Sequence, residues 1–462
     1  MKNWLRRSIA IALVLCLSGC AITSPQLKPY VPVAGTWNEA GTANAPAVSA
    51  TWWESFGSAE LQSLIAQALA GSPDLAIATE RVNQAEAQVK VAGSSLFPVL
   101  TAGSGASSRR TSGAGSAVTA NTSNLTLTAS YELDLWGKNR AGVRSAQSSA
   151  AASRFDRDTA QLTLVSGVAT SYFNVLALRT RLGIARDNLA TAQRVLDLVS
   201  ARARNGAASA LDVSRQESTV LSQRAGIVPL EQQERQTLAA LAVLLGQTPE
   251  GFDVKATGIT DLAAPAIDPG LPAELLVRRP DLASAEAQLA AANADVSAAR
   301  AALLPTITLT GTAGLASSAL LSFVSSGTTT ALTIAASLLQ PIFDGGRLRG
   351  QKAVAESRER ELVETYRKAI LSAFEDVEQA LAGTSRLGQQ EQLQDDVQAR
   401  ARESLRLAEV RYRAGADDQL TVLDAQRTLF SAQDQLAQVR LNRLQAAVSL
   451  YKALGGGWSE SG

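Results

Sequence analysis

Three residues close to a glycine turn near the carboxyl end of the chain offer an apolar group and two opposite charges. They are Leu420, Asp424 and Arg427, and they follow Gly415. In a helix their i, i+4 and i+7 spacing places all three on one face. Such side chains can attract and pair ions but offer no group that breaks bonds. Charges beside a turn usually form a solvated helix face, so the spacing alone does not establish a site.

An earlier glycine turn, at Gly206, is followed by a different set of side chains. The corresponding residues are Leu211, Arg215 and Ser218. Only the later turn therefore combines an aspartate with an arginine. Three further aspartates near the two turns are weaker candidates for a functional charge: Asp212, Asp417 and Asp418. Because they stand at expected helix starts, capping of the helices explains them as well.

Residues suited to catalysis or metal binding do not form a recognisable site in this sequence. The chain has no histidine among its 462 residues, which excludes a histidine ligand, a histidine base and a Ser-His or Cys-His nucleophile. Gly345-Gly346 lacks the remainder of a phosphate-binding loop, and Asp395-Asp396 fits an amphipathic helix. With 43 basic and 42 acidic residues, the chain lacks the positive charge of a nucleic-acid-binding protein. We expect no enzyme activity, cofactor, metal site or nucleic-acid partner.

The amino-terminal segment has the pattern of a bacterial lipoprotein signal peptide. Residues 1–19 combine a positive start, a short apolar stretch and small residues before Cys20. The apolar stretch is too short to cross a membrane. We predict that Cys20 becomes the mature amino terminus and carries diacylglycerol and palmitoyl groups; the alternative is a signal peptide with an incidental cysteine. Ala21, in place of aspartate, favours sorting to the outer membrane.

The remaining chain contains two copies of one unit. Pro98 and Pro305 stand 207 residues apart, and Gly206 and Gly415 stand 209 residues apart, so one small insertion separates the two offsets. We therefore expect a signal peptide, a lipidated tether with an equatorial segment, a first repeat, an equatorial linker, a second repeat and a tail. Their residues are 1–19, 20–71, 72–246, 247–278, 279–455 and 456–462.

Both repeats predict the same order of elements. Residues 73–96 are rich in alanine and follow the start signal of a helix, a proline at its first position. Alternation of period two over 123–135 predicts a strand with one apolar and one polar face, and 99–109 a second strand. Stretches rich in serine, glycine and threonine, 110–122 and 315–330, predict exposed loops.

Long proline-free segments follow the strands. Residues 138–205 and 347–414 predict two very long helices, and the first has apolar residues at heptad spacing. Glycines end these helices, and shorter helices return over about 209–245 and 418–454. Pro229 is expected to kink the first of the shorter helices.

Helix length and strand count predict the assembly. A helix of about 68 residues is roughly 100 Å long, too long for one globular domain. Four strands of about ten residues suit tilted membrane crossings but leave two edges that lipid cannot satisfy. Three chains would supply twelve strands and close a barrel, and no uninterrupted apolar run of about 18 residues remains for a helical crossing. The alternative is a soluble β-sandwich with a coiled coil.

The ordered motifs of the chain resemble those of the TolC-like outer membrane factors, in their lipoprotein (NodT-type) branch. The motifs are Trp52-Trp53-x-x-Phe56 with Leu61 and Leu64, Leu276-x-x-Arg279-Pro280-Asp281-Leu282 with Glu286, Leu304-Pro305, Pro341-Ile342-Phe343-Asp344-Gly345-Gly346, and Tyr412-x-x-Gly415 with Leu420-x-x-x-Asp424-x-x-Arg427. The resemblance implies an α+β membrane protein. Its long α-helical coiled-coil barrel, a periplasmic tunnel, would join a transmembrane β-barrel of twelve strands, four from each protomer of a homotrimer.

The resemblance also implies partners and a mechanism. Such proteins are exit ducts of tripartite efflux pumps, with a periplasmic adaptor protein, an inner-membrane RND-type pump and outer membrane lipid as partners. The periplasmic gate would lie at the helix tips, with Leu420 as an apolar plug, Asp424 as a ring of carboxylates and Arg427 as an ionic clamp. Asp212, Asp417 and Asp418 would be weaker candidates for charge at this aperture or for contact with the adaptor protein. Three Asp424 side chains near a threefold axis would repel one another unless Arg427 or a bound cation offsets them.

Two other functions stay open at this point. A duct for type I protein secretion shares the architecture, although the lipid anchor and the tryptophan-rich segment favour efflux of drugs, dyes, solvents or metals. A structural coiled-coil lipoprotein that links the envelope layers would have neither a barrel nor a conductance.

Overall fold

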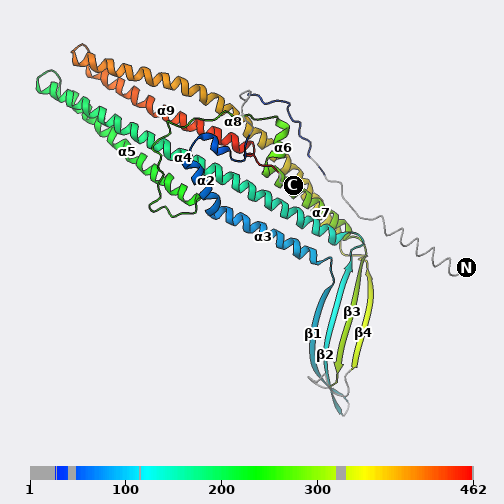
Figure 1. Ribbon diagram of the computed structural model, residues 1–462. Helices are drawn as coiled ribbons and strands as arrows, with labels where there is room; N and C mark the ends of the chain where they lie inside the picture. The colour runs from blue at the N-terminus through cyan, green and yellow to red at the C-terminus, as the bar shows by residue number, and fades with distance from the viewer. Residues whose placement is uncertain (1–26, 28, 40–47, 114–115, 319–328, 460–462) are drawn as a thin grey trace. The chain divides into compact units, whose positions relative to one another are not determined.

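The computed structural model describes residues 27, 29–39, 48–113, 116–318 and 329–459. The predicted signal peptide and Cys20 lie outside these residues. Over the described ranges the chain is mainly helical and contains one antiparallel sheet (Figure 1). The described residues divide into two compact units. The first takes them from Met1–Tyr30, Arg81–Arg154 and Ser284–Arg367, and the second from Val31–Glu80, Phe155–Ala283 and Lys368–Gly462.

Helices of the two halves have equal lengths. α3 (Pro73–Ser94) and α7 (Pro280–Ala301) have 22 residues each. α4 (Lys138–Arg204) and α8 (Arg347–Arg413) have 67 residues each. α5 (Ala210–Leu244) and α9 (Gln419–Ala453) have 35 residues each, and α5 continues through Pro229. The predicted helices are confirmed to within two residues at each end.

The sheet of the first unit runs in the order β1-β2-β3-β4. Its strands are β1 (Val99–Gly113), β2 (Ser116–Leu133), β3 (Thr306–Ser317) and β4 (Thr329–Leu339). The prediction of a loop over 110–122 is wrong, because β1 and β2 pair along almost all of this stretch. At the same end of the sheet, residues 315–317 and 329–330 of the second predicted loop also belong to β3 and β4. Both faces of the β1–β2 extension are polar or small, so the alternation that marks a strand is absent although backbone pairing continues.

Helices of the first unit associate in pairs. Arg154 of α4 forms an ion pair with Glu86 of α3, with 2.8 Å between Nη2 and Oε1. The segment of α7 in this unit packs on α8, where Leu289 and Ala292 share a buried apolar cluster with Leu362. In each pair, the short helix before the strands therefore lies beside the long helix that follows them.

Short elements of the second unit precede the first helix of each repeat. The 3-10 helix η1 (Trp52–Phe56) and α2 (Ala59–Gly71) come before α3, and the 3-10 helix η2 (Pro272–Glu274) and α6 (Leu275–Arg278) come before α7. Trp52 stacks on Tyr451 of α9 with 4.9 Å between ring centres. Phe56 contacts Phe173 of α4 at 5.0 Å. The tryptophan-rich motif thus attaches the amino-terminal segment to α4 and α9 through aromatic packing.

Two glycines allow the close approach of helix ends. Gly246 and Gly455 have φ angles of 71° and 85°, in the left-handed region that glycine tolerates. A Cβ atom on Gly246 would collide with the carbonyl oxygen of Gly71, and one on Gly455 with the carbonyl oxygen of Arg278. The same backbone contact therefore occurs once in each half of the chain.

Among the described residues, one helix is long and apolar enough to pass a composition test for membrane crossing. This helix is α4, and 61% of its most apolar 18-residue window is buried inside the protein. Val168, Phe173 and Leu176 of α4 are almost completely buried. Since a buried core helix passes the same test, the window is weak support for a helical crossing.

Candidate functional site at the helix tips

Each long helix of the second unit ends at a glycine turn. Gly206 follows α4 with a φ angle of 71°, and Gly415 follows α8 with a φ angle of 76°. Both turns close through an amide that donates to the carbonyl five residues earlier: Ala207 to Arg202 at 2.8 Å and Ala416 to Arg411 at 2.9 Å. This is the glycine-dependent end of a helix, and it reverses the chain into α5 or α9.

A recess of about 500 Å³ lies between α5 and α9 just beyond these turns. Its lining includes all three candidates of the later turn, Leu420, Asp424 and Arg427. Arg215 and Ser218 of α5, which follow the earlier turn, also line it. The fold therefore brings together residues that are about two hundred positions apart in the sequence. Leu211 does not belong to this lining, and it is 57% exposed.

The charges of the recess are accessible to solvent. Asp424, Arg427 and Arg215 are all exposed, and none of the three forms an ion pair with another described residue. The lining thus includes one carboxylate and two guanidinium groups, and none of them is held in an ion pair among the described residues. Gln426 also lines the recess; its side chain is fully buried, and neither its amide nitrogen nor its oxygen has a hydrogen-bond partner among the described residues. A recess with unfixed charges and an unsatisfied amide can exchange partners when the helices move.

The three weaker aspartates take part in local contacts at the helix starts. Asp212 forms a capping box with Ser209, and these backbone and side-chain hydrogen bonds lower the pKa of Asp212. Asp417 accepts from Arg411 at 2.6 Å, which lowers the pKa of Asp417. Asp418 caps α9 by accepting the amide of Thr421 at 3.0 Å. Helix capping and turn closure account for these contacts.

A contact between the tips was missed at the sequence level. The guanidinium of Arg202 lies 4.4 Å from the ring centre of Tyr412 and also donates to the carbonyl of Tyr412. Tyr412 is 4% exposed, and burial raises its pKa. A second contact joins the tips: the side-chain amide of Gln419 in α9 donates a hydrogen bond to the backbone carbonyl of Asp212 in α5 at 2.9 Å. An arginine four residues before each glycine turn, Arg202 and Arg411, was the only sequence feature that indicated a role for Arg202. It did not indicate that Tyr412 is the residue that Arg202 contacts.

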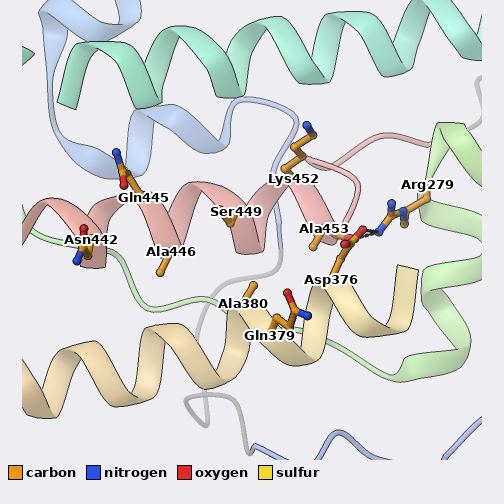
Figure 2. Close-up of a pocket in the computed structure, with 10 residues that line it drawn as sticks. All are labelled: Arg279, Asp376, Gln379, Ala380, Asn442, Gln445, Ala446, Ser449, Lys452 and Ala453. Atoms are coloured by element: carbon orange, nitrogen blue, oxygen red, sulfur yellow. Dashed lines mark hydrogen bonds and ion pairs between the residues drawn. The ribbon is translucent and has the colours of Figure 1, made fainter. Parts of the chain in front are cut away.

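A second recess of about 530 Å³ lies between α8 and α9 and contains Arg279 (Figure 2). Figure 2 shows the guanidinium directed at Asp376 of α8, with 3.1 Å between Nη1 and Oδ2. Arg279 also binds Asp281 at 2.7 Å and donates to the carbonyl of Ala453 at 3.3 Å. Burial lowers the pKa of Arg279, but the hydrogen bonds that its guanidinium donates to Asp281 and Asp376 outweigh this effect and raise the pKa. The Arg279-Pro280-Asp281 motif therefore joins the start of α7 to α8 and to the end of α9.

Within the described ranges, no group of three histidine, cysteine, aspartate or glutamate residues could hold a metal ion. The recesses thus offer charge, polar side chains and space.

Paired long helices with charged tips, combined with a small sheet, define a class of α-helical tunnel proteins. The chain belongs to the outer membrane efflux protein family, whose pattern matches residues 64–247 and 271–456. Proteins of this family are efflux channels of the Gram-negative outer membrane and not enzymes.

Individual relatives extend over nearly the whole chain. The pyoverdine export outer membrane protein OpmQ of Pseudomonas aeruginosa is 45% identical, over 97% of this chain and 96% of OpmQ. The toluene efflux pump outer membrane protein TtgF of Pseudomonas putida is 36% identical, over 97% of this chain and 96% of TtgF. The solved open state of the MtrE outer membrane channel of Neisseria gonorrhoeae matches with a TM-score of 0.85 and 31% identity, over 95% of this chain and 98% of MtrE.

Proposed function

We propose that this outer membrane efflux protein works as a homotrimer whose sheets close into one barrel of twelve strands. The sheet order leaves β1 and β4 as unpaired edges. β4 is exposed along its whole length, and its apolar residues Leu332 and Ile334 are 76% and 83% exposed. An open edge in lipid would leave backbone groups without hydrogen bonds, and pairing of β4 with β1 of another copy removes that cost.

The two matched segments of the chain support our proposed division into domains. The first repeat spans 72–246 and the second 279–455, with 247–278 as linker and 456–462 as tail. Equal helix lengths in both halves and the repeated Gly246 and Gly455 contacts favour a duplication. Three duplicated chains supply twelve long or stacked helical columns for the tunnel wall.

The recess at the helix tips carries our proposal for the gate. In a trimer, Asp424 would occur three times around the axis, with Leu420 as an apolar plug beside it. The guanidinium groups of Arg427 and Arg215 are available to form ion pairs with these carboxylates, because neither has an ion-pair partner among the described residues. Asp212, Asp417 and Asp418 lie at the same tips and are secondary candidates for contact with the adaptor protein.

Conductance tests the gate directly. Asp424→Ala or Arg427→Ala is expected to loosen the closed state and to raise single-channel conductance in planar bilayers. Glu217→Ala is the matched control, because Glu217 is also an exposed charge near a tip but does not line the recess. If both gate variants conduct like the control, the gate assignment is wrong.

We further propose that the duct passes small molecules delivered by an inner-membrane RND-type pump through a periplasmic adaptor. The similarity to two pyoverdine export proteins, 45% and 43% identical, favours a siderophore over a solvent as the main cargo. Deletion of the gene should lower siderophore in the medium and raise drug susceptibility, while secreted proteins stay unchanged. Loss of a secreted protein instead would indicate type I secretion.

Lipidation of Cys20 completes the proposal. The residues before Cys20 fit a lipoprotein signal peptide, and acylation would hold the tether at the outer membrane. Wild-type protein should incorporate radioactive palmitate, and Cys20→Ser should not. A labelled Cys20→Ser protein would contradict this assignment.

A further inference from the structure

The four strands carry very few charges, and these are segregated by position. Arg109 and Arg110 lie in the half of β1 that is remote from the helices. Glu132 lies at the end of β2 next to α4, where it forms an ion pair with Lys138 at 2.6 Å. β3 and β4 contain no charged residue. The end of the sheet away from the helices is therefore its positive end.

Strand register places the two arginines on opposite faces of the sheet. Arg110 pairs with Thr119, on the same face as the pairs Ala102–Leu127 and Ser104–Leu125. This face is the apolar one, and it also holds a recess lined by Leu125, Leu127 and Leu332. Arg109 pairs with Ala120, on the face of the pairs Gly103–Thr126 and Ser107–Thr122, which is polar. In a membrane-embedded sheet the apolar face contacts lipid and the polar face contacts the channel.

Distance along the strand gives the height of Arg110 in the membrane. Leu100 is the first residue of β1 on the apolar face, and Arg110 is ten residues farther along the same face. At roughly 3.3 Å per residue this separation is about 33 Å along the strand. A tilt of about 40° reduces it to about 25 Å along the membrane normal, which is the height of the apolar band of such sheets. Arg110 therefore stands where hydrocarbon ends and headgroups begin.

We propose that Arg110 binds a phosphate of the glycolipid that forms the outer leaflet of the outer membrane. The helices lie on the periplasmic side, so the remote end of the sheet faces the cell exterior. The phosphorylated sugars of that leaflet carry negative charge at the level of Arg110. A guanidinium matches a phosphate in geometry and charge, and it is less strongly hydrated than an ammonium group. Arg110 is exposed and forms no ion pair with another described residue, so its donors are available.

The proposal rests on the proposed placement of the sheet in the outer membrane, and Arg109 supplies its matched control. Purified full-length protein is titrated with lipopolysaccharide and, separately, with the same glycolipid after enzymatic removal of its phosphates. Arg110→Gln is expected to weaken binding to lipopolysaccharide at least fivefold. Arg110→Lys should lose less than Arg110→Gln, and Arg109→Gln should change binding less than twofold. Wild-type protein should bind the dephosphorylated glycolipid at least fivefold more weakly.

Equal losses of affinity for lipopolysaccharide in Arg109→Gln and Arg110→Gln would overturn the proposal, because the glycolipid would then not distinguish the two faces of the sheet. Unchanged binding in Arg110→Gln, or equal binding of both glycolipids by wild-type protein, would also overturn it. A trimer band on unboiled gels and a normal conductance show that a variant has assembled. If wild-type protein itself shows neither, the placement in the membrane fails, and that failure is separate from failure of the lipid contact.

A second measurement avoids any change at the arginines. A photo-crosslinking amino acid at Ser108 lies on the face of Arg110, and one at Ser107 lies on the opposite face, where the Ser107 hydroxyl contacts Thr122 at 2.8 Å. In whole cells, the Ser108 variant should capture lipopolysaccharide at least fivefold more than the Ser107 variant. Equal capture, or capture by Ser107 alone, would refute the assignment of Arg110 to the lipid face.

Discussion

Replacing Arg202 with alanine is expected to loosen the contact between the two helix tips. The guanidinium stacks 4.4 Å from the ring centre of Tyr412 and donates to the carbonyl of the same residue. A cation–π contact contributes about 0.5–2 kcal/mol, and a hydrogen bond from a charged donor about 1.5–3 kcal/mol. Arg202 keeps partial access to solvent, so the lower part of each range applies. Loss of both contacts should cost about 2 kcal/mol of local stability.

Hydrogen exchange measures this loss. A change of about 2 kcal/mol raises the population of the open tip about 30-fold, because each 1.4 kcal/mol is a factor of about ten. Amides around the Gly415 turn should therefore exchange about 30-fold faster in Arg202→Ala, while amides near the sheet stay unchanged. Arg202→Lys keeps the charge but loses the planar stack, and it should give an intermediate rate.

Tyr412→Phe is the control that separates the ring from the hydroxyl. The hydroxyl is buried and has no hydrogen-bond partner among the described residues, so its removal should leave exchange equal or slightly slower. Faster exchange in Tyr412→Phe, comparable to that of Arg202→Ala, would show that the hydroxyl matters and would refute the stacking argument. The stacking argument would also be refuted if amides around the Gly415 turn exchanged at the same rate in Arg202→Ala as in the wild-type protein.

Three other perturbations test the packing of the second unit, each by the temperature at which the trimer band is lost on unboiled gels. Gly246→Ala should lower this temperature, because the new Cβ would be strained at a left-handed φ and would overlap the carbonyl oxygen of Gly71, at a cost of more than about 2 kcal/mol. Gly226→Ala is the control: Gly226 lies in helix α5 with open space around it, so this change should raise the temperature slightly. Arg279→Ala should cost about 2 kcal/mol, below the usual value for a buried ion pair because its two aspartates are 38% and 52% exposed. Asp417 has a lowered pKa because of its hydrogen bond with Arg411, so its stabilisation is complete above the ordinary pKa of about 4 and is lost as the pH falls through the lower folded value. In Asp417→Asn, the temperature of trimer loss should depend less on pH below about pH 4, and its pH dependence between about pH 5 and 8 should be unaffected. If the pH dependence below about pH 4 is the same as in the wild-type protein, the Asp417–Arg411 pair does not stabilise the tip.

Helices were predictable because local sequence determines them. The segments over α4 and α8 lack proline and end at glycines that the left-handed turn requires, and their bounds agree with prediction. The equivalent positions of Gly206 and Gly415 also followed from one repeat offset. Local propensity and internal comparison therefore sufficed for the helical framework.

Contacts between distant segments were not predictable in the same way. Nothing near Arg202 in the sequence indicates a partner at Tyr412, because the contact depends on how α4 lies against α8. The motif around Arg279 was recognised without its purpose, since Asp376 and Ala453 come from elements that are remote in sequence. The long β1–β2 hairpin was missed for another reason: polar residues on both faces leave no alternation to detect.

Equal helix lengths restrict how this chain can change in length over evolution. One inserted residue in α4 would rotate everything beyond it by about 100° and shift it by about 1.5 Å relative to its neighbours. Because α8 also has 67 residues, the two columns could stay matched only if a compensating insertion arose in the other half. Strands of 15 and 18 residues in the first half and of 12 and 11 in the second show no such matching. Natural insertions and deletions should therefore accumulate in the hairpin ends and be rare, or paired, along the helices.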